Sequence, residues 1–146
     1  MTPPSPTTAA EPLPLAVCVV IRHAERYLLV RRAPGRPAPG YWTPVTGKLE
    51  PDETLPEAAR REVREETGLS VTVGPEVHRC PTSNGAFLLV WFRATLDDPT
   101  EPLALARDEV DDARWVTATE ALALDPMFPA TRAWLATDSA PIAASQ

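Results

Sequence analysis

The alternation of hydrophobic and polar positions along the chain predicts strands and helices in turn. Leu15–His23 is rich in Val and Ile, and the apolar segment 27–32 follows it after a short polar stretch, so the two are expected to form a strand hairpin. Segment 32–40 holds three prolines and two glycines, which is typical of a loop. The other segments expected to be extended are 45–49, 69–77, 86–96 and 113–117.

The strongest helix signal begins at Thr54. Thr54 and Glu57 match the T-x-x-E capping box, in which each side chain satisfies a backbone N–H of the other residue. Gly68 is the expected C-terminal stop of this helix. Two shorter helices are expected, one from Thr119 and one over 126–136. This order of strands and helices suits a layered α/β domain.

The length of 146 residues suits one folded domain, which is expected over residues 14–137. Residues 1–13 are rich in Pro, Thr and Ala without periodicity, so they are expected to form a disordered arm, and 138–146 a flexible tail. No apolar run approaches the roughly 18 residues that a membrane span needs, and the N-terminus lacks the features of a signal peptide. A cytoplasmic protein without a membrane partner is therefore expected.

The composition narrows the kinds of ligand. The chain has 14 basic and 20 acidic residues and a net charge of −6, which argues against a nucleic-acid partner but not against a small phosphate ligand. Two cysteines, Cys18 and Cys80, and two histidines are too few for a disulfide scaffold or a zinc cluster. Any metal ion is expected to be a hard cation with oxygen ligands.

The predicted helix carries carboxylates at the edge of its apolar face. Leu55, Ala59 and Val63 are spaced four apart and define that face. On a helical wheel, Glu62 and Glu66 project beside it. Partial burial of an ionised carboxylate needs a partner, and two carboxylates four residues apart repel each other. A divalent cation such as Mg²⁺ relieves both effects, so the pattern favours a metal site over a solvated charged face.

These carboxylates belong to a longer, gapless pattern over residues 47–69. The residues at its fixed positions are Gly47, Glu53, Arg61, Glu62, Val63, Glu65, Glu66, Gly68 and Leu69. The pattern resembles the Nudix box, G-x5-E-x7-R-E-U-x-E-E-x-G-U with U an aliphatic residue, at every position. The resemblance extends over about residues 14–136, because the predicted hairpin, Trp42, Glu109 and Trp115 also fit the family.

The resemblance implies a fold and a reaction. Nudix hydrolases have an α/β fold in which a mixed β-sheet is sandwiched between helices. They cleave a phosphoanhydride bond by attack of water on phosphorus, with Mg²⁺ or Mn²⁺ as cofactor, and their substrates are small molecules of the nucleotide type. A divalent cation screens the charge of such a substrate and lowers the pKa of a bound water. Family members are often dimers, so a homodimer is also expected.

The resemblance also implies roles for residues of this chain. Glu62 and Glu66 are expected to be the main metal ligands, together with the backbone carbonyl of Thr46. Glu65 is expected to be a further ligand or to hold a second ion through water. Glu109 is expected as another metal ligand, and the alternative is that it is an ordinary surface acid in an acidic loop. Glu62 and Glu109 are the two candidates for the general base.

The other box residues are expected to support these ligands. Arg61 would act in catalysis by orienting a neighbouring glutamate rather than by touching the substrate. Glu53 would lie behind the metal ligands. Gly47 and Gly68 would serve the backbone conformation.

A triphosphate is the expected substrate, because Val-Thr-Gly at 45–47 resembles the branch of the family that acts on dihydroneopterin triphosphate and nucleoside triphosphates. ADP-ribose or a nucleotide sugar is the alternative substrate class. A non-catalytic nucleotide sensor with the same fold is the alternative of a different class. The residues expected to bind substrate, by gripping phosphates or stacking on a base, are Arg31, Arg32, Arg36, Trp42 and Phe87.

Overall fold

The computed structural model describes residues 12–139, so most of the expected arm and tail lies outside the described residues. Within this range the strands are β1 (Leu15–His23), β2 (Arg26–Arg32), β3 (Trp42–Thr43), β4 (Val45–Lys48), β5 (Val71–Pro81), β6 (Leu88–Leu96) and β7 (Val110–Val116). The helices in the same range are α2 (Leu55–Thr67), α3 (Ala118–Leu122) and α4 (Pro129–Ser139). Of these helices, none is long and apolar enough to cross a membrane.

The strands form a mixed β-sheet that splits at its centre. β1 runs parallel to β6, which is antiparallel to β5. On its other side, β1 pairs with β2 only at the hairpin, where His23 lies opposite Arg26. The two strands then diverge, and the segment formed by β3 and β4 lies between them, with β3 paired to β2 and β4 paired to β1. β7 pairs with β2, so the expected mixed sheet is confirmed.

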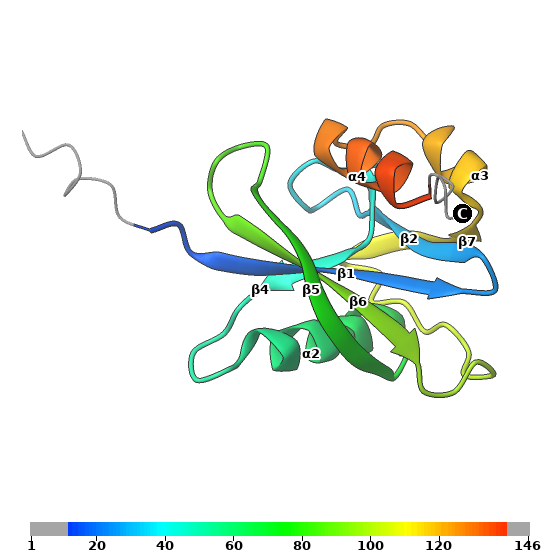
Figure 1. Cartoon of the computed structure of the whole chain (residues 1–146), viewed down its shortest axis with the longest axis horizontal. Helices are drawn as coiled ribbons and strands as arrows, with labels where there is room; N and C mark the ends of the chain where they lie inside the picture. The colour runs from blue at the N-terminus through cyan, green and yellow to red at the C-terminus, as the bar shows by residue number, and fades with distance from the viewer. Residues whose placement is uncertain (1–11, 140–146) are drawn as a thin grey trace, which may run out of the picture.

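Helices cover both faces of this sheet, with α2 on one face and α3 and α4 on the other (Figure 1). Side chains alternate along each strand, so each face has its own core. Val17 and Val19 of β1 pack with Val63 of α2. Cys18 and Val20 of the same strand belong to the opposite cluster, with residues of α3 and α4. The expected arrangement of a sheet between helices is therefore present.

The capping residues predicted for α2 are confirmed. The Thr54 side chain accepts a hydrogen bond from the Glu57 backbone N–H at 3.2 Å, and the Glu57 carboxylate accepts one from the Thr54 N–H at 2.8 Å. Gly68 ends the helix with φ at +79°, a left-handed conformation that glycine adopts without a steric penalty. These local bonds fix where α2 begins and ends, and hence which carboxylates reach the sheet.

The structure differs from the sequence-based expectation near α4. The expected helix over 126–136 instead begins at Pro129, because Pro126 accepts a hydrogen bond from the Trp42 N–H and Met127 forms a bridge to the same residue. β3 itself was not predicted, since two residues carry no periodicity. At the other end, α4 continues to Ser139, so Asp138 is helical rather than part of a flexible tail.

Asp138 fastens α4 to the sheet. Its carboxylate accepts a hydrogen bond of 2.6 Å from the Tyr27 hydroxyl and forms an ion pair with Arg93. The Arg22 guanidinium lies 3.9 Å from the same carboxylate. Burial opposes ionisation of Asp138, but the hydrogen bonds from Arg93 and Tyr27 outweigh it and hold the pKa of this carboxyl below its usual range. The ionised carboxylate therefore contributes to the stability of the fold.

We expect Asp138→Asn to lower the free energy of unfolding by about 1–3 kcal/mol, because it removes the charge that Arg93 and Tyr27 bind. Chemical denaturation at neutral pH measures this difference. Because the folded pKa is depressed, the difference should shrink as the pH falls through it. Asp125→Asn is the control, since that side chain is 89% exposed, and equal losses in the two variants would contradict the assignment.

Candidate active site

Three carboxylates from two separate elements meet beside the split in the sheet. Glu62 and Glu66 lie on α2, and Glu109 immediately precedes β7. One oxygen of each lies within 4.8 Å of the other two, and Glu62 and Glu66 are only 8% and 5% exposed. A cluster of carboxylate oxygens at this spacing suits a hard divalent cation. We call these three residues the carboxylate cluster.

Gly47 allows Glu62 to reach this position. A Cβ atom added at Gly47 would lie 1.9 Å from Cδ and 2.1 Å from Oε2 of Glu62. Gly47 is not among the residues with a positive φ, so its expected role in backbone conformation is corrected to one of space. The absence of a side chain lets the Glu62 carboxylate pack directly on the backbone of β4.

Arg61 holds the loop before α2 against the helix. Its guanidinium donates hydrogen bonds to the Glu53 carboxylate at 2.6 and 3.0 Å and to the Lys48 carbonyl at 2.9 Å. It also donates to Glu62 at 2.9 Å and to Glu65 at 3.1 Å. Arg61 thus links β4, the loop and one carboxylate of the cluster, and it lies behind the site.

The environment of the cluster disfavours three negative charges. Burial raises the pKa of Glu62, although its hydrogen bonds to Glu66 and Arg61 oppose this. Burial, the nearby charge of Glu62 and the hydrogen bond with it raise the pKa of Glu66 to about 9, and Glu109 adds to the effect. At neutral pH the cluster without a cation therefore holds a proton on Glu66. A divalent cation supplies the positive charge that this proton provides.

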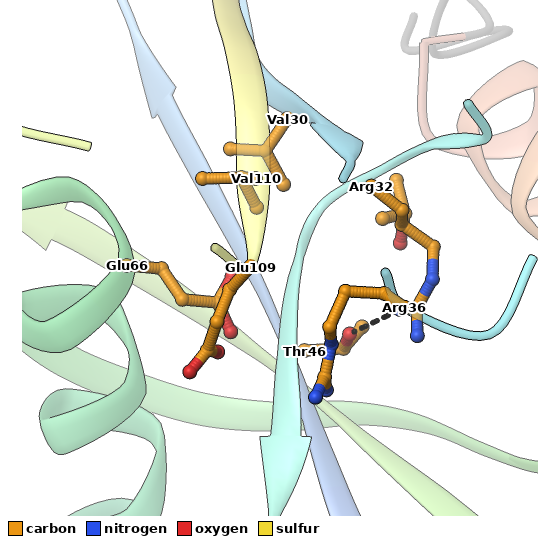
Figure 2. Close-up of a pocket in the computed structure, with 8 residues that line it drawn as sticks. Val30, Arg32, Arg36, Thr46, Glu66, Glu109 and Val110 are labelled. Atoms are coloured by element: carbon orange, nitrogen blue, oxygen red, sulfur yellow. Dashed lines mark hydrogen bonds between the residues drawn. The ribbon is translucent and has the colours of Figure 1, made fainter. Parts of the chain in front are cut away.

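Two arginines face the carboxylates across a small cavity. Arg32 of β2 and Arg36 of the following loop line it together with Thr46, Glu66 and Glu109 (Figure 2). Its volume is about 10 Å³, which leaves room for about one water molecule. Burial and the neighbouring Arg36 lower the pKa of the Arg32 guanidinium, so this cation is poorly solvated. The cavity thus has an anionic side and a cationic side.

Not all of the expected site residues join this arrangement. Glu65 lies outside the carboxylate cluster, with a side chain 53% exposed and bound to Arg61. Arg31 alternates with Arg32 along β2, so it lies on the opposite face of the sheet and pairs with Asp111 at 2.7 Å. Arg31 therefore does not face the carboxylates.

The two expected stacking residues have different positions. Trp42 is 4% exposed, and its ring packs in the core beneath the guanidinium groups of Arg31 and Arg114. Its expected role in stacking on a base is corrected to a core role, because no face of the ring is free. Phe87 is half-buried, with Nζ of Lys48 5.4 Å from its ring centroid. Lys48 was not singled out from the sequence, although it directly follows Gly47.

Gly47→Ala is expected to displace the Glu62 carboxylate and weaken Mn²⁺ binding at least about tenfold. The fold should persist, because α2 keeps its caps and apolar contacts. Isothermal titration calorimetry with Mn²⁺ measures the change. Gly35→Ala is the matched control, since an added Cβ there meets no atom within 4 Å. Unchanged Mn²⁺ affinity in Gly47→Ala would show that this close approach does not matter.

The raised pKa of Glu66 predicts a pH dependence. Glu66 binds a proton more tightly in the folded state than in the unfolded state. The contribution of this proton to the free energy of unfolding is therefore complete below pH 4.5 and is lost as the pH rises toward about 9. Cation binding displaces this proton, so the Mn²⁺ affinity should rise by up to about tenfold per pH unit below that pKa. Titrations between about pH 6 and 8 test this, and a pH-independent affinity would contradict it.

Comparisons with known proteins identify relatives of the whole chain. The family model of the NUDIX domain matches residues 12–137. The chain is 34% identical over 119 residues to Nudix hydrolase 19, chloroplastic, of Arabidopsis thaliana, which covers 73% of this chain and 25% of that protein. It is 38% identical over 113 residues to the phosphatase NudJ of Escherichia coli O1:K1, covering 72% and 68% of the two chains. The chain spans a quarter or less of the length of several curated relatives that it matches.

Solved structures share the fold. The MutT protein from Methanosarcina mazei Go1 superposes with a TM-score of 0.73 at 25% sequence identity, over 87% of this chain and 93% of that one. Members of the family hydrolyse phosphoanhydride bonds and generally need a divalent metal. The family match over nearly the whole described chain, together with the complete box, shows that this protein belongs to the Nudix hydrolase family.

Proposed function

We propose that this chain is a Mg²⁺- or Mn²⁺-dependent pyrophosphohydrolase acting on nucleoside triphosphates or a related triphosphate. The observation that carries the proposal is that Glu66 and Glu109 of the carboxylate cluster line one small cavity together with Arg32 and Arg36. A phosphoanhydride substrate needs both sides, because its metal ion binds carboxylates while its own oxygens bind fixed cations.

A divalent cation suits the carboxylate cluster, because burial raises the pKa values of Glu62 and Glu66 and so disfavours their negative charges without a nearby positive charge. We assign Glu62, Glu66 and Glu109 as the residues that hold this cation, with the Thr46 carbonyl as a further ligand. When bound, the cation neutralises phosphate charge and lowers the pKa of a coordinated water. Glu62 and Glu109, the two candidates for the general base, lie together in the cluster. Glu65 is left as the candidate for a second ion.

Arg32 and Arg36 are assigned to the phosphate chain of the substrate. The Arg32 guanidinium donates a long hydrogen bond of 3.5 Å to the Thr46 hydroxyl and is partly buried, so an incoming phosphate oxygen improves its solvation. Two adjacent arginines suit a polyphosphate better than a single phosphate. Lys48 at the end of β4 and Phe87 just before β6 lie close together. They offer a cation and an aromatic ring to the rest of the nucleotide.

A non-catalytic nucleotide sensor is the main alternative of another class. Such a protein has no need for a costly cluster of buried carboxylates, whereas this chain keeps every box glutamate and brings two of them together with Glu109. ADP-ribose and nucleotide sugars are the alternative substrates. They carry a diphosphate between two sugars, so they place fewer anionic oxygens before Arg32 and Arg36.

The test is a phosphate-release screen with Mg²⁺ over nucleoside triphosphates, dihydroneopterin triphosphate, ADP-ribose, nucleotide sugars and dinucleoside polyphosphates. We expect a triphosphate to be hydrolysed and Glu66→Gln to reduce its turnover on the order of 100-fold or more, because a ligand charge is lost at nearly constant volume. Glu25→Gln, on a side chain 87% exposed, is the matched control. Normal turnover in Glu66→Gln at saturating Mg²⁺ would overturn the site assignment.

A further inference from the structure

A second cavity lies at the other end of the sheet from the carboxylate cluster. Its volume is about 260 Å³, and it is bordered by the β1–β2 hairpin, the end of β6, the loop 97–109 and β7. Trp115, which lines it, follows Val110 by five positions along β7, a distance of roughly 16 Å in a strand. The cavity is therefore separate from the site described above, and we call it the distal cavity.

The walls of the distal cavity are mainly apolar. Leu69, Leu96 and Pro99 contribute aliphatic surface. Trp115 contributes an indole ring, which His23 meets edge-on with the ring centroids 6.3 Å apart and the planes at 67°. An aromatic wall of this kind favours a flat ligand that stacks on it or meets its edge. His23 adds a hydrogen-bonding edge to the lining.

The charged residues at the cavity are already paired. The Glu101 carboxylate accepts hydrogen bonds from the Ser70 N–H at 2.8 Å and from Arg64 at 3.0 Å. Arg26 forms an ion pair of 3.2 Å with Glu120. A ligand therefore gains little from a charge of its own. An engineered apolar cavity of about 150 Å³ holds benzene, so the distal cavity has room for a fused two-ring molecule such as indole.

The loop that borders the distal cavity also carries Glu109. After Pro99 and Glu101 it is fastened to the end of α2, where the Ala104 N–H donates to the Thr67 carbonyl at 2.7 Å. The Ala106 N–H donates to the carbonyl of Glu66 at 3.0 Å, and the Glu109 N–H donates to the carbonyl of Ala106 at 2.8 Å. In Figure 1 this yellow-green loop leaves the end of β6 and passes on to β7. One continuous segment thus connects the two cavities.

We propose that the distal cavity is an effector site for an uncharged, planar aromatic molecule, whose binding holds loop 97–109 in the conformation that places Glu109 in the carboxylate cluster. The second part of this proposal rests on the proposed metal site. A ligand packed against Pro99 adds contacts to the loop in the conformation that places Glu109 in the cluster, so it favours the same conformation as the cation that binds Glu109. The effect is reciprocal, because the cation then raises the affinity for the aromatic ligand by the same factor.

Binding is tested first without metal, with indole as the probe and the full ¹⁵N-labelled chain in EDTA. We expect saturable amide shifts confined to the cavity, at Leu69, Ser70, Leu96 and Glu101, and a shift of the Trp115 indole N–H. Shifts scattered over the surface, or none at millimolar indole, would overturn the proposal. Shifts of the same amides with protein concentration alone would show that a second copy of the chain fills the cavity, which also overturns it.

A filled-cavity variant tests the location. Leu96→Trp should weaken indole binding at least tenfold, whereas Leu103→Trp, at an exposed position of loop 97–109 outside the cavity lining, should not. Equal binding in the two variants would contradict the proposal. If Leu96→Trp does not fold, intermolecular NOEs between indole and the Leu69 and Leu96 methyl groups of the wild type decide the location, and their absence overturns it.

The coupling is tested by titrating Mn²⁺ with and without saturating indole. We expect indole to tighten Mn²⁺ binding about fivefold in the wild type and to leave it unchanged in Leu96→Trp. Equal Mn²⁺ affinities with and without indole would overturn the coupling. Glu66→Gln separates the two proposals, because it should lose Mn²⁺ and still bind indole. A wild type that binds indole but no Mn²⁺ would refute the metal site alone.

Discussion

The burial of two carboxyl groups side by side, one of them packed on the backbone of a β-strand, is the constraint on which the rest of the structure depends. Glu62 and Glu66 lie on one helix face and are almost completely removed from solvent. Ionised carboxylates in that position are strongly unfavourable unless a positive charge is supplied. Arg61 supplies it to Glu62 from behind, and a proton supplies it to Glu66 when no cation is bound. This arrangement supports the proposal that a metal ion replaces the proton when it binds.

The split in the sheet makes this burial possible. Because β1 and β2 diverge after their hairpin, β3 and β4 enter between them and expose the backbone at Gly47 to α2. The same divergence leaves Arg32 on the α2 face, opposite Glu66, within reach of Thr46. β7, on the other side of β2, brings Glu109 from far along the chain. Cations and carboxylates therefore meet where the sheet is interrupted, and this supports the proposed site for a polyphosphate and its metal ion.

Much of this arrangement follows from local signals in the sequence. The caps of α2 and the wheel positions of Glu62 and Glu66 depend on residues close in the chain, and the structure agrees with them. The reason for glycine at position 47 could not be predicted, because it is a contact with Glu62, which lies 15 positions further along the chain. The core position of Trp42 could not be predicted either, because its face of the sheet depends on the pairing of β3, a two-residue strand without periodicity, with β2. The position of Arg31 follows from alternation along β2, which places it on the face opposite Arg32.

The central claim is that Glu62, Glu66 and Glu109 together hold one divalent cation. The most direct test is a crystal structure of the protein soaked in Mn²⁺, with anomalous scattering used to locate the ion. The account predicts an anomalous peak bonded to oxygens of all three carboxylates. A peak elsewhere, or no peak in this cluster at saturating Mn²⁺, would contradict it.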